Sequence, residues 1–102
     1  MTIELLHIAE CPNWEETFRR LKIAVDKTLP AGTSLDATLI DSVEKAEARH
    51  FAGSPTILID GVDLFPSEGR THDLACRIYF TPGGMAGSPT QEQIEEALAT
   101  HG

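Results

Sequence analysis

The sequence predicts a single α/β domain with a central mixed sheet, in which a βαβ unit is followed by a β-hairpin and a C-terminal helix. Short apolar runs alternate with amphipathic segments over residues 1–65, a pattern typical of βαβ units. A right-handed crossover makes the first two strands parallel, and the hairpin adds antiparallel strands. The chain of 102 residues suffices for one core and is too short for two, so we assign residues 1–102 to one domain.

The first half of the chain predicts a strand, a helix and a second strand. Residues 3–8 are mostly apolar, which is typical of a strand buried on both faces. Residues 12–29 predict an amphipathic helix, because apolar side chains recur at helical spacing at Trp14, Phe18, Leu21 and Val25. Pro12 suits the first helical position, which places Cys11 at the N-cap. Alternating apolar and polar residues predict the second strand at 34–39.

The next part of the chain predicts a short helix and a hairpin. Asp41 and Glu44 have the spacing of a capping box, so a helix is expected to begin there. Asp60-Gly61 is a dipeptide that tolerates positive φ in a two-residue hairpin turn. The apolar and β-branched residues on either side of it predict strands at 56–59 and 62–65.

Residues 66–87 are rich in proline and glycine and predict a mainly irregular segment with one short element at 75–80. A loop of this length in a small domain is usually functional. A final helix follows, and residues 88–91 and 90–93 each have the spacing to cap its start.

The composition excludes several classes of function. The net charge is -8 and the eight Lys and Arg residues are scattered, so a nucleic acid or an anionic membrane surface would be repelled. No apolar run approaches the ~20 residues of a membrane span, and the first residues lack the basic segment of a signal peptide. We expect a soluble, cytoplasmic protein. The sequence does not indicate its oligomeric state.

The two cysteines, Cys11 and Cys76, are too few for a disulfide scaffold. In a reducing compartment they are expected to be thiols with chemistry or small buried hydrophobes. A cysteine at a helix N-terminus meets free N–H groups and the positive end of the helix dipole, which favours the thiolate of Cys11. Glu10, Glu15 and Glu16 act in the opposite direction. The structural alternative is an inert cysteine at the end of a strand.

The order of the elements and two motifs resemble the thioredoxin-like family. Cys11-Pro12-Asn13-Trp14 follows the first strand, where that family has its Cys-x-x-Cys motif, and Ser54-Pro55-Thr56 stands where it has a cis-proline. The resemblance implies that Cys11 attacks disulfides, and that Trp14 in place of a second cysteine makes this a one-thiol, glutaredoxin-type site. It also implies that Trp14, Ser54, Pro55 and Thr56 bind the substrate. The implied partners are protein or small-molecule thiols and disulfides, including glutathione.

A second resemblance concerns the C-terminal part of the chain. Residues 76–80 and 88–92 resemble the tail of the alkylmercury lyase family. This resemblance implies that Cys11 and Cys76 together handle an organomercurial or another soft-metal electrophile. In the redox interpretation, Cys76 is instead the candidate thiol that resolves a mixed disulfide on Cys11.

Each of these residues also has a structural interpretation. Cys76 is a core residue if its apolar neighbours Ile78 and Phe80 pack in the interior. Trp14 is either a core residue or a cover that keeps water from the thiol of Cys11.

We therefore expect a thiol-dependent redox protein that acts through Cys11, with no resident metal or cofactor. The Ser54–Pro55 turn would position the disulfide, and Cys76 or an external thiol would release the product. Two alternatives remain open: a thioredoxin-like binding module without turnover, and lyase-like handling of a soft metal by both cysteines. The sequence also leaves open whether the protein is an enzyme.

Overall fold

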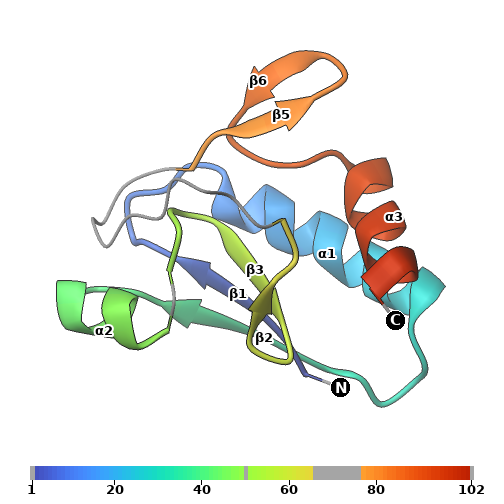
Figure 1. Cartoon of the computed structure of the whole chain (residues 1–102), viewed down its shortest axis with the longest axis horizontal. Helices are drawn as coiled ribbons and strands as arrows, with labels where there is room; N and C mark the ends of the chain where they lie inside the picture. The colour runs from blue at the N-terminus through green and yellow to red at the C-terminus, as the bar shows by residue number, and fades with distance from the viewer. Residues whose placement is uncertain (1, 50, 66–76, 102) are drawn as a thin grey trace.

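A computed structural model describes residues 2–49, 51–65 and 77–101. In chain order the elements are β1 (Thr2–His7), α1 (Trp14–Thr28), β2 (Ser34–Leu39), α2 (Val43–Ala48), β3 (Thr56–Ile59), β4 (Val62–Asp63), β5 (Tyr79–Thr81), β6 (Gly84–Ala86) and α3 (Gln91–His101) (Figure 1). The predicted α/β class is confirmed.

Within the described part of the chain, four strands form one mixed sheet with the order β2-β1-β3-β4. The central strand β1 runs parallel to β2, with Leu5 opposite Ala37, and antiparallel to β3, with Leu5 opposite Ile57. β3 returns as β4 through Asp60 and Gly61, which have φ of 49° and 84°. The predicted hairpin is confirmed, although β4 is shorter than the expected 62–65 because pairing ends at Asp63.

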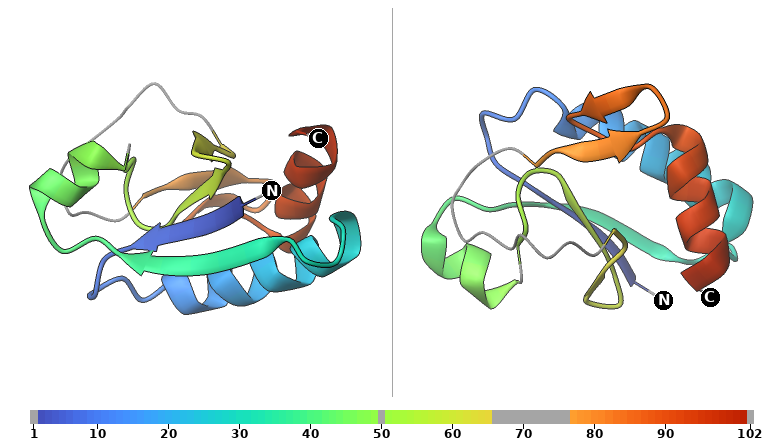
Figure 2. Two further views of the ribbon diagram at one scale, coloured as in Figure 1. Left: turned by 90° about the horizontal axis from the view of Figure 1, so that it is seen from below. Right: turned by 45° about the horizontal axis from the view of Figure 1, so that its top comes forward.

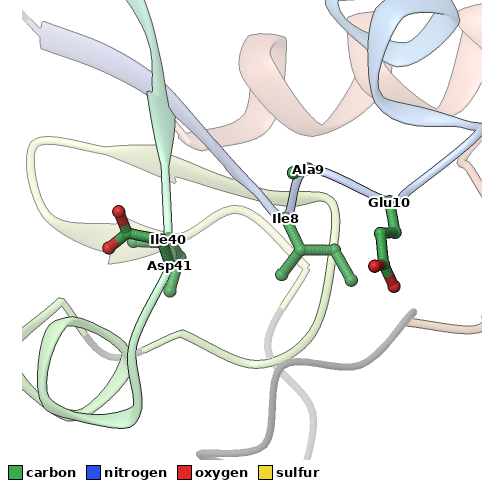
Figure 3. A pocket seen from close by; sticks show the side chains of 5 residues that line it. All are labelled: Ile8, Ala9, Glu10, Ile40 and Asp41. Carbon is green, nitrogen blue, oxygen red and sulfur yellow. The ribbon is translucent and has the colours of Figure 1, made fainter.

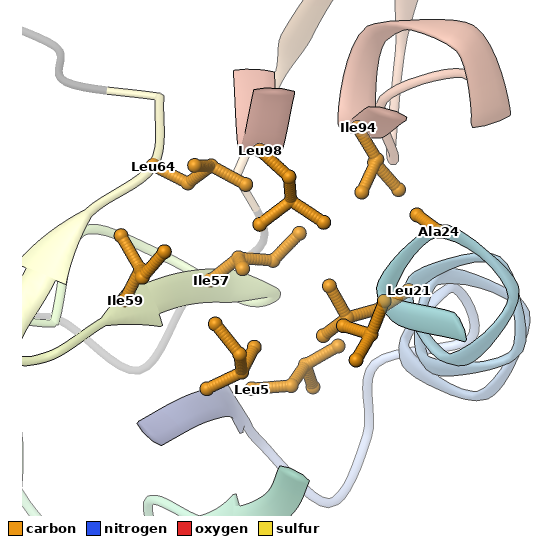
Figure 4. Close-up of a cluster of buried hydrophobic side chains, with 10 residues drawn as sticks. Leu5, Leu21, Ala24, Ile57, Ile59, Leu64, Ile94 and Leu98 are labelled. Carbon is orange, nitrogen blue, oxygen red and sulfur yellow. The ribbon is translucent and has the colours of Figure 1, made fainter. Parts of the chain in front are cut away.

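The larger core lies between one face of this sheet and the two longest helices. α1 and α3 lie side by side against that face, where leucine and isoleucine side chains from both helices meet those of β1 and β3 (Figures 1 and 4). The period-two alternation of β1 sends Ile3 and Leu5 to this face. The buried members of the cluster are Ile3, Leu5, Leu21, Ala24, Val25, Ile57, Ile59, Leu64, Ile94 and Leu98.

A smaller core covers the opposite face, on the side of α2. Leu6 and Leu58 are the inward residues of β1 and β3 here, and Phe51 fills the space beside them. Cys11 belongs to this second cluster. The two helical layers therefore enclose the sheet, and the thiol lies in the smaller of the two apolar clusters.

The helix starts follow local hydrogen bonding more closely than the sequence spacing suggested. Ser42, and not Asp41, caps α2, since its side chain accepts a hydrogen bond from the Lys45 N–H. At α3 the predicted capping box over 90–93 is present: Thr90 Oγ1 accepts from the Gln93 N–H at 3.1 Å, and Gln93 Oε1 accepts from the Thr90 N–H at 2.9 Å. The alternative cap at 88–91 is not used.

Residues 77–87 are more regular than predicted. β5 and β6 form a separate antiparallel pair in which Phe80 faces Met85, and this hairpin stands outside the four-stranded sheet (Figures 1 and 2). The expectation of a mainly irregular segment over 66–87 is thus wrong for this part. The turn at Pro82 and Gly83, together with the positive φ of Gly84 at 115°, closes the hairpin.

None of the helices in the described ranges is long and apolar enough to cross a membrane.

Candidate functional site

Cys11 lies in the connection between β1 and α1. Its N–H donates to the Ile8 carbonyl at 3.3 Å, which folds the chain into a tight turn directly after the strand. α1 begins only at Trp14, with Asn13 as the N-cap. The predictions that Cys11 is the N-cap and Pro12 the first helical residue are therefore wrong, because this turn intervenes between strand and helix.

The thiol of Cys11 is buried, with 5% of the residue exposed. It packs in the smaller core with Ile8 and Phe51. Its one hydrogen-bonding contact among the described residues is to the carbonyl oxygen of Ser54, 3.8 Å from Sγ. The β1–α1 connection and the Ser54–Pro55 turn, distant in sequence, thus meet at the sulfur.

The Ser54–Pro55 turn is held by hydrogen bonds from two other segments. Ser54 Oγ accepts from the Ile8 N–H at 3.1 Å, and the Ser54 carbonyl accepts from the Arg77 N–H at 2.8 Å. The Ser54–Pro55 peptide bond is cis, as the sequence predicted. The Ser54 carbonyl therefore has two donors, the backbone of Arg77 and the thiol of Cys11.

Thr56 supports the same turn from within. It is fully buried, and its hydroxyl donates to the Gly53 carbonyl and accepts from the Ala52 N–H at 3.2 Å. As the first residue of β3, it lies opposite Leu6 of β1. Its side chain is therefore occupied in holding the turn, while the backbone of Ser54 is the part of the motif that reaches Cys11.

Sequence reasoning missed a buried polar cluster behind the turn. Tyr79 is 5% exposed, and its hydroxyl donates to the Pro55 carbonyl. Arg77 lies over the Tyr79 ring at 4.7 Å and pairs with Asp63 at 2.9 Å. Burial raises the pKa of the Tyr79 hydroxyl far above its ordinary value; the nearby Arg77 acts against this, and Asp63 and Cys11 add to it.

The alternation of polar and apolar residues over 77–80 was the sequence signal for this cluster. Arg77 and Tyr79 point inward, where Asp63 and the Pro55 carbonyl are their partners, and Ile78 and Phe80 point outward with 63% and 78% of their surface exposed. The expectation that Ile78 and Phe80 pack in the interior is wrong. A period of two in a short segment indicates a strand even where the inward residues are polar.

Trp14 lies beside Cys11 and contacts both apolar clusters. Its ring stacks on the imidazole of His7, with centroids 3.8 Å apart and planes 8° apart. His7 is buried, and its Nδ1 lies 3.3 Å from the Ile8 carbonyl. The stacked pair joins the end of β1 to the first turn of α1.

A shallow pocket of about 250 Å³ opens beside the same connection. Ile8, Ala9 and Glu10 line it from the β1 side, and Ile40 and Asp41 from the end of β2 (Figure 3). Asp41 is paired with Lys45 at 2.9 Å. The pocket lies where the two parallel strands end, which is where α/β sheets commonly bind ligands.

Cys76 lies outside the described residues, so the predicted meeting of Cys76 and Cys11 stays a prediction. Over the ranges that the structure describes, no group of three His, Cys, Asp or Glu residues is placed to hold a metal ion.

This arrangement provides one buried thiol next to a backbone carbonyl, on a turn that two other segments hold in place. Such a sulfur can form a mixed disulfide if its contact with Ser54 opens, and otherwise it is a packed apolar residue. Comparison of the chain with protein-family models, curated proteins and solved structures gave no match.

Proposed function

We propose that this protein is a thioredoxin-like thiol redox protein that acts through Cys11. The observation that carries the proposal is the 3.8 Å contact between Cys11 Sγ and the Ser54 carbonyl. It joins the residue after β1 to the turn before β3, which are the two places where the thioredoxin-like resemblance expects a nucleophile and its substrate-positioning segment. The strand order β2-β1-β3-β4, with helices on both faces of the sheet, supports the same proposal.

The proposed reaction is a thiol–disulfide exchange. The Cys11 thiolate attacks one sulfur of a disulfide, a bond forms between the two sulfurs, and the other substrate sulfur leaves as a thiolate that takes up a proton. Glutathione then attacks the substrate-derived sulfur of the mixed disulfide, forms a new disulfide with it and releases Cys11, which takes up a proton. In the alternative, Cys76 attacks Cys11 Sγ, the bound substrate sulfur leaves as a thiolate that takes up a proton, and an external thiol reduces the resulting Cys11–Cys76 disulfide. Trp14 stands at the place of the second cysteine, so the resolving thiol has to come from outside the local motif.

The backbone of Ser54 is the proposed positioning group for the incoming disulfide. Trp14 and Pro55 would flank it, and Thr56 would hold the turn in shape, as its buried hydrogen bonds indicate. The reducing conditions of the cytoplasm suit this chemistry, because they supply the resolving thiol.

The burial of Cys11 favours a second candidate function. A cysteine that is 5% exposed among Ile8 and Phe51 behaves as a small hydrophobe unless the site opens. The second candidate is therefore a binding module that keeps the thioredoxin-like turn and has no turnover. Soft-metal or organomercurial handling by Cys11 and Cys76 is the third, and it needs both thiols.

The experiment that separates these candidates uses a glutathione mixed disulfide as substrate, with glutathione as the reductant. We expect wild-type protein to accelerate its reduction, Cys11→Ser to abolish the acceleration, and mass spectrometry to detect a glutathione adduct on Cys11. Cys76→Ser is the matched control: unchanged activity assigns resolution to external glutathione, and an accumulating adduct assigns it to Cys76. Wild-type protein that neither reduces the substrate nor forms the adduct would contradict the redox proposal. Release of mercury from an organomercurial that requires both cysteines would favour the third candidate.

A further inference from the structure

The β5–β6 hairpin presents an exposed apolar surface next to the candidate site. Ile78, Phe80 and Met85 are 63%, 78% and 71% exposed, and Phe80 and Met85 lie opposite each other across the two strands. Large apolar side chains gathered in this way on a small domain commonly mark a binding surface. We call these three residues the hairpin patch.

Two contacts connect the β5–β6 hairpin to the segments around Cys11. Tyr79, between two patch residues, donates to the Pro55 carbonyl, and Gly87, just after β6, packs against the side chain of Asn13. A Cβ on Gly87 would lie 2.1 Å from Asn13 Nδ2, so the two segments touch without space between them. The patch side chains themselves point away from the Ser54–Pro55 turn, so it is the β6 end of the hairpin, through Gly87 and Asn13, that adjoins the Cys11-to-Trp14 segment. A ligand that extends along β6 past Gly87 would therefore reach this segment.

The charges around the hairpin patch favour one kind of ligand. Residues 78–91 contain no charged side chain, in a chain that is 24% charged. Glu10 and Glu15, on either side of the Cys11-to-Trp14 segment, are exposed, and neither forms an ion pair with another described residue. An apolar ligand with basic ends suits this surface, and an acidic one is repelled.

The cations nearest to the hairpin are already engaged. Arg77 is buried and paired with Asp63, and Arg20, which donates to Ser88 and to the Pro89 carbonyl, lies 3.3 Å from the Glu16 carboxylate. Asp63 and Glu16 balance these two charges, which therefore do not offset those of Glu10 and Glu15.

The exposed edge of β6 favours an extended conformation of the ligand. All three residues of β6 are exposed, and among the described residues β6 pairs only with β5. On β5, the Phe80 carbonyl already accepts a hydrogen bond from Gln93 at 2.9 Å. An exposed edge strand of this kind accepts an extended peptide as an additional strand.

The size of the patch argues against a second copy of this chain. The exposed parts of the three side chains amount to about 400 Å², if a fully exposed large side chain offers roughly 200 Å². Two copies pairing through it would bury about 800 Å² in total, which is less than the ~1,000 Å² expected of a stable interface.

We propose that the hairpin patch docks an extended, apolar segment with basic flanks from a protein, and so presents that protein's cysteine to Cys11. The identity of the substrate rests on the proposed redox function, whereas the docking itself does not. The preferred substrate is then a protein disulfide or a protein–glutathione mixed disulfide, and free glutathione disulfide is a poor one because it carries net negative charge.

The test measures docking without thiol chemistry. Two fluorescein-labelled peptides, Lys-Ile-Val-Ser-Phe-Val-Lys and its counterpart with Glu at both ends, carry serine where a substrate would carry cysteine. Fluorescence anisotropy should show at least tenfold tighter binding of the basic peptide, equivalent to about 1.4 kcal/mol. The double variant Phe80→Ser/Met85→Ser should bind it at least tenfold more weakly. Val62→Ser, which changes a 54% exposed residue on β4, is the matched control and should bind within twofold of wild type.

A second measurement protects the test against a misfolded variant. On wild-type protein, the basic peptide should shift the amide resonances of Gly84–Ala86 and leave those of β2 unchanged. Equal binding by wild type and the double variant, equal binding of the two peptides, or shifts confined to other strands would overturn the proposal. So would a concentration-dependent dimer that Phe80→Ser abolishes. Cys11→Ser should dock the peptide normally, because docking needs no thiol. Wild-type protein that docks the basic peptide but reduces no disulfide would refute only the redox function.

Discussion

Replacing Tyr79 with phenylalanine tests whether strand β5 holds the Ser54–Pro55 turn in place. The substitution retains the ring, which meets Phe65 edge-on at 5.6 Å and lies under the Arg77 guanidinium. Only the hydroxyl that donates to the Pro55 carbonyl is lost. The variant therefore isolates one hydrogen bond in the support of the candidate site.

The size of the expected effect follows from burial. Tyr79 is 5% exposed and Pro55 is buried, so water does not readily replace the missing donor. A neutral hydrogen bond contributes about 1 kcal/mol net, and leaving a buried partner unsatisfied costs up to about 3 kcal/mol. We expect Tyr79→Phe to lower the free energy of unfolding by ~1–3 kcal/mol and the Tm by at least ~4 °C.

Urea unfolding followed by the fluorescence of Trp14, the single tryptophan of the chain, measures this loss. Phe80→Leu is the control, because the neighbouring side chain is 78% exposed and its replacement should change stability by less than ~0.5 kcal/mol. A Tyr79→Phe protein as stable as the control would refute the reasoning. It would mean that the turn keeps its position without β5.

Three further predictions concern the same region. Spectrophotometric titration of Tyr79, the single tyrosine, should show ionisation only above its ordinary pKa of 10.0, because burial raises the pKa in the folded protein. The folded state therefore holds this proton more tightly, so the stabilising contribution is complete below pH 10.0 and is lost as the pH rises further; unchanged stability above that pH would contradict this. Arg77→Met should cost about 3 kcal/mol in thermal or urea unfolding, since it leaves the Asp63 carboxylate without its partner, and adding Asp63→Asn should restore part of the loss; two simply additive losses would exclude the coupling. Gly53→Ala should destabilise more than Gly61→Ala in the same assay. Both have positive φ, which costs about 1–2 kcal/mol for alanine, but only at Gly53 would the new Cβ lie 2.8 Å from Arg77 Cβ. Equal losses would show that the backbone around Arg77 moves to make room.

Local patterns predicted most of the elements. The four apolar positions from Trp14 to Val25 predicted α1, and Asp60-Gly61 predicted the hairpin between β3 and β4. The reciprocal hydrogen bonds of Thr90 and Gln93 confirmed one of the two predicted caps of α3. These features succeed because each depends on neighbours within a few residues.

The errors occur where tertiary contacts decide. Asn13 caps α1 by its backbone position, while its side chain packs against Gly87, a contact that no local pattern contains. The hairpin over 77–87 exists because Arg77 and Tyr79 find partners in Asp63 and Pro55, so two polar residues take the inward positions. A hydrophobicity pattern assigns such residues to the surface and reverses the two faces of the strand.

The contact between Cys11 and Ser54 constrains how the sulfur can react. As a thiol, Sγ can donate to the Ser54 carbonyl at 3.8 Å; as a thiolate it is an acceptor only, and two electron-rich atoms then face each other. The carbonyl cannot easily turn away, because the Arg77 N–H holds it at 2.8 Å. The Arg77 and Tyr79 cluster therefore fixes the carbonyl side of this contact. The proposed attack on a disulfide accordingly requires the sulfur, and not the Ser54–Pro55 turn, to leave the contact.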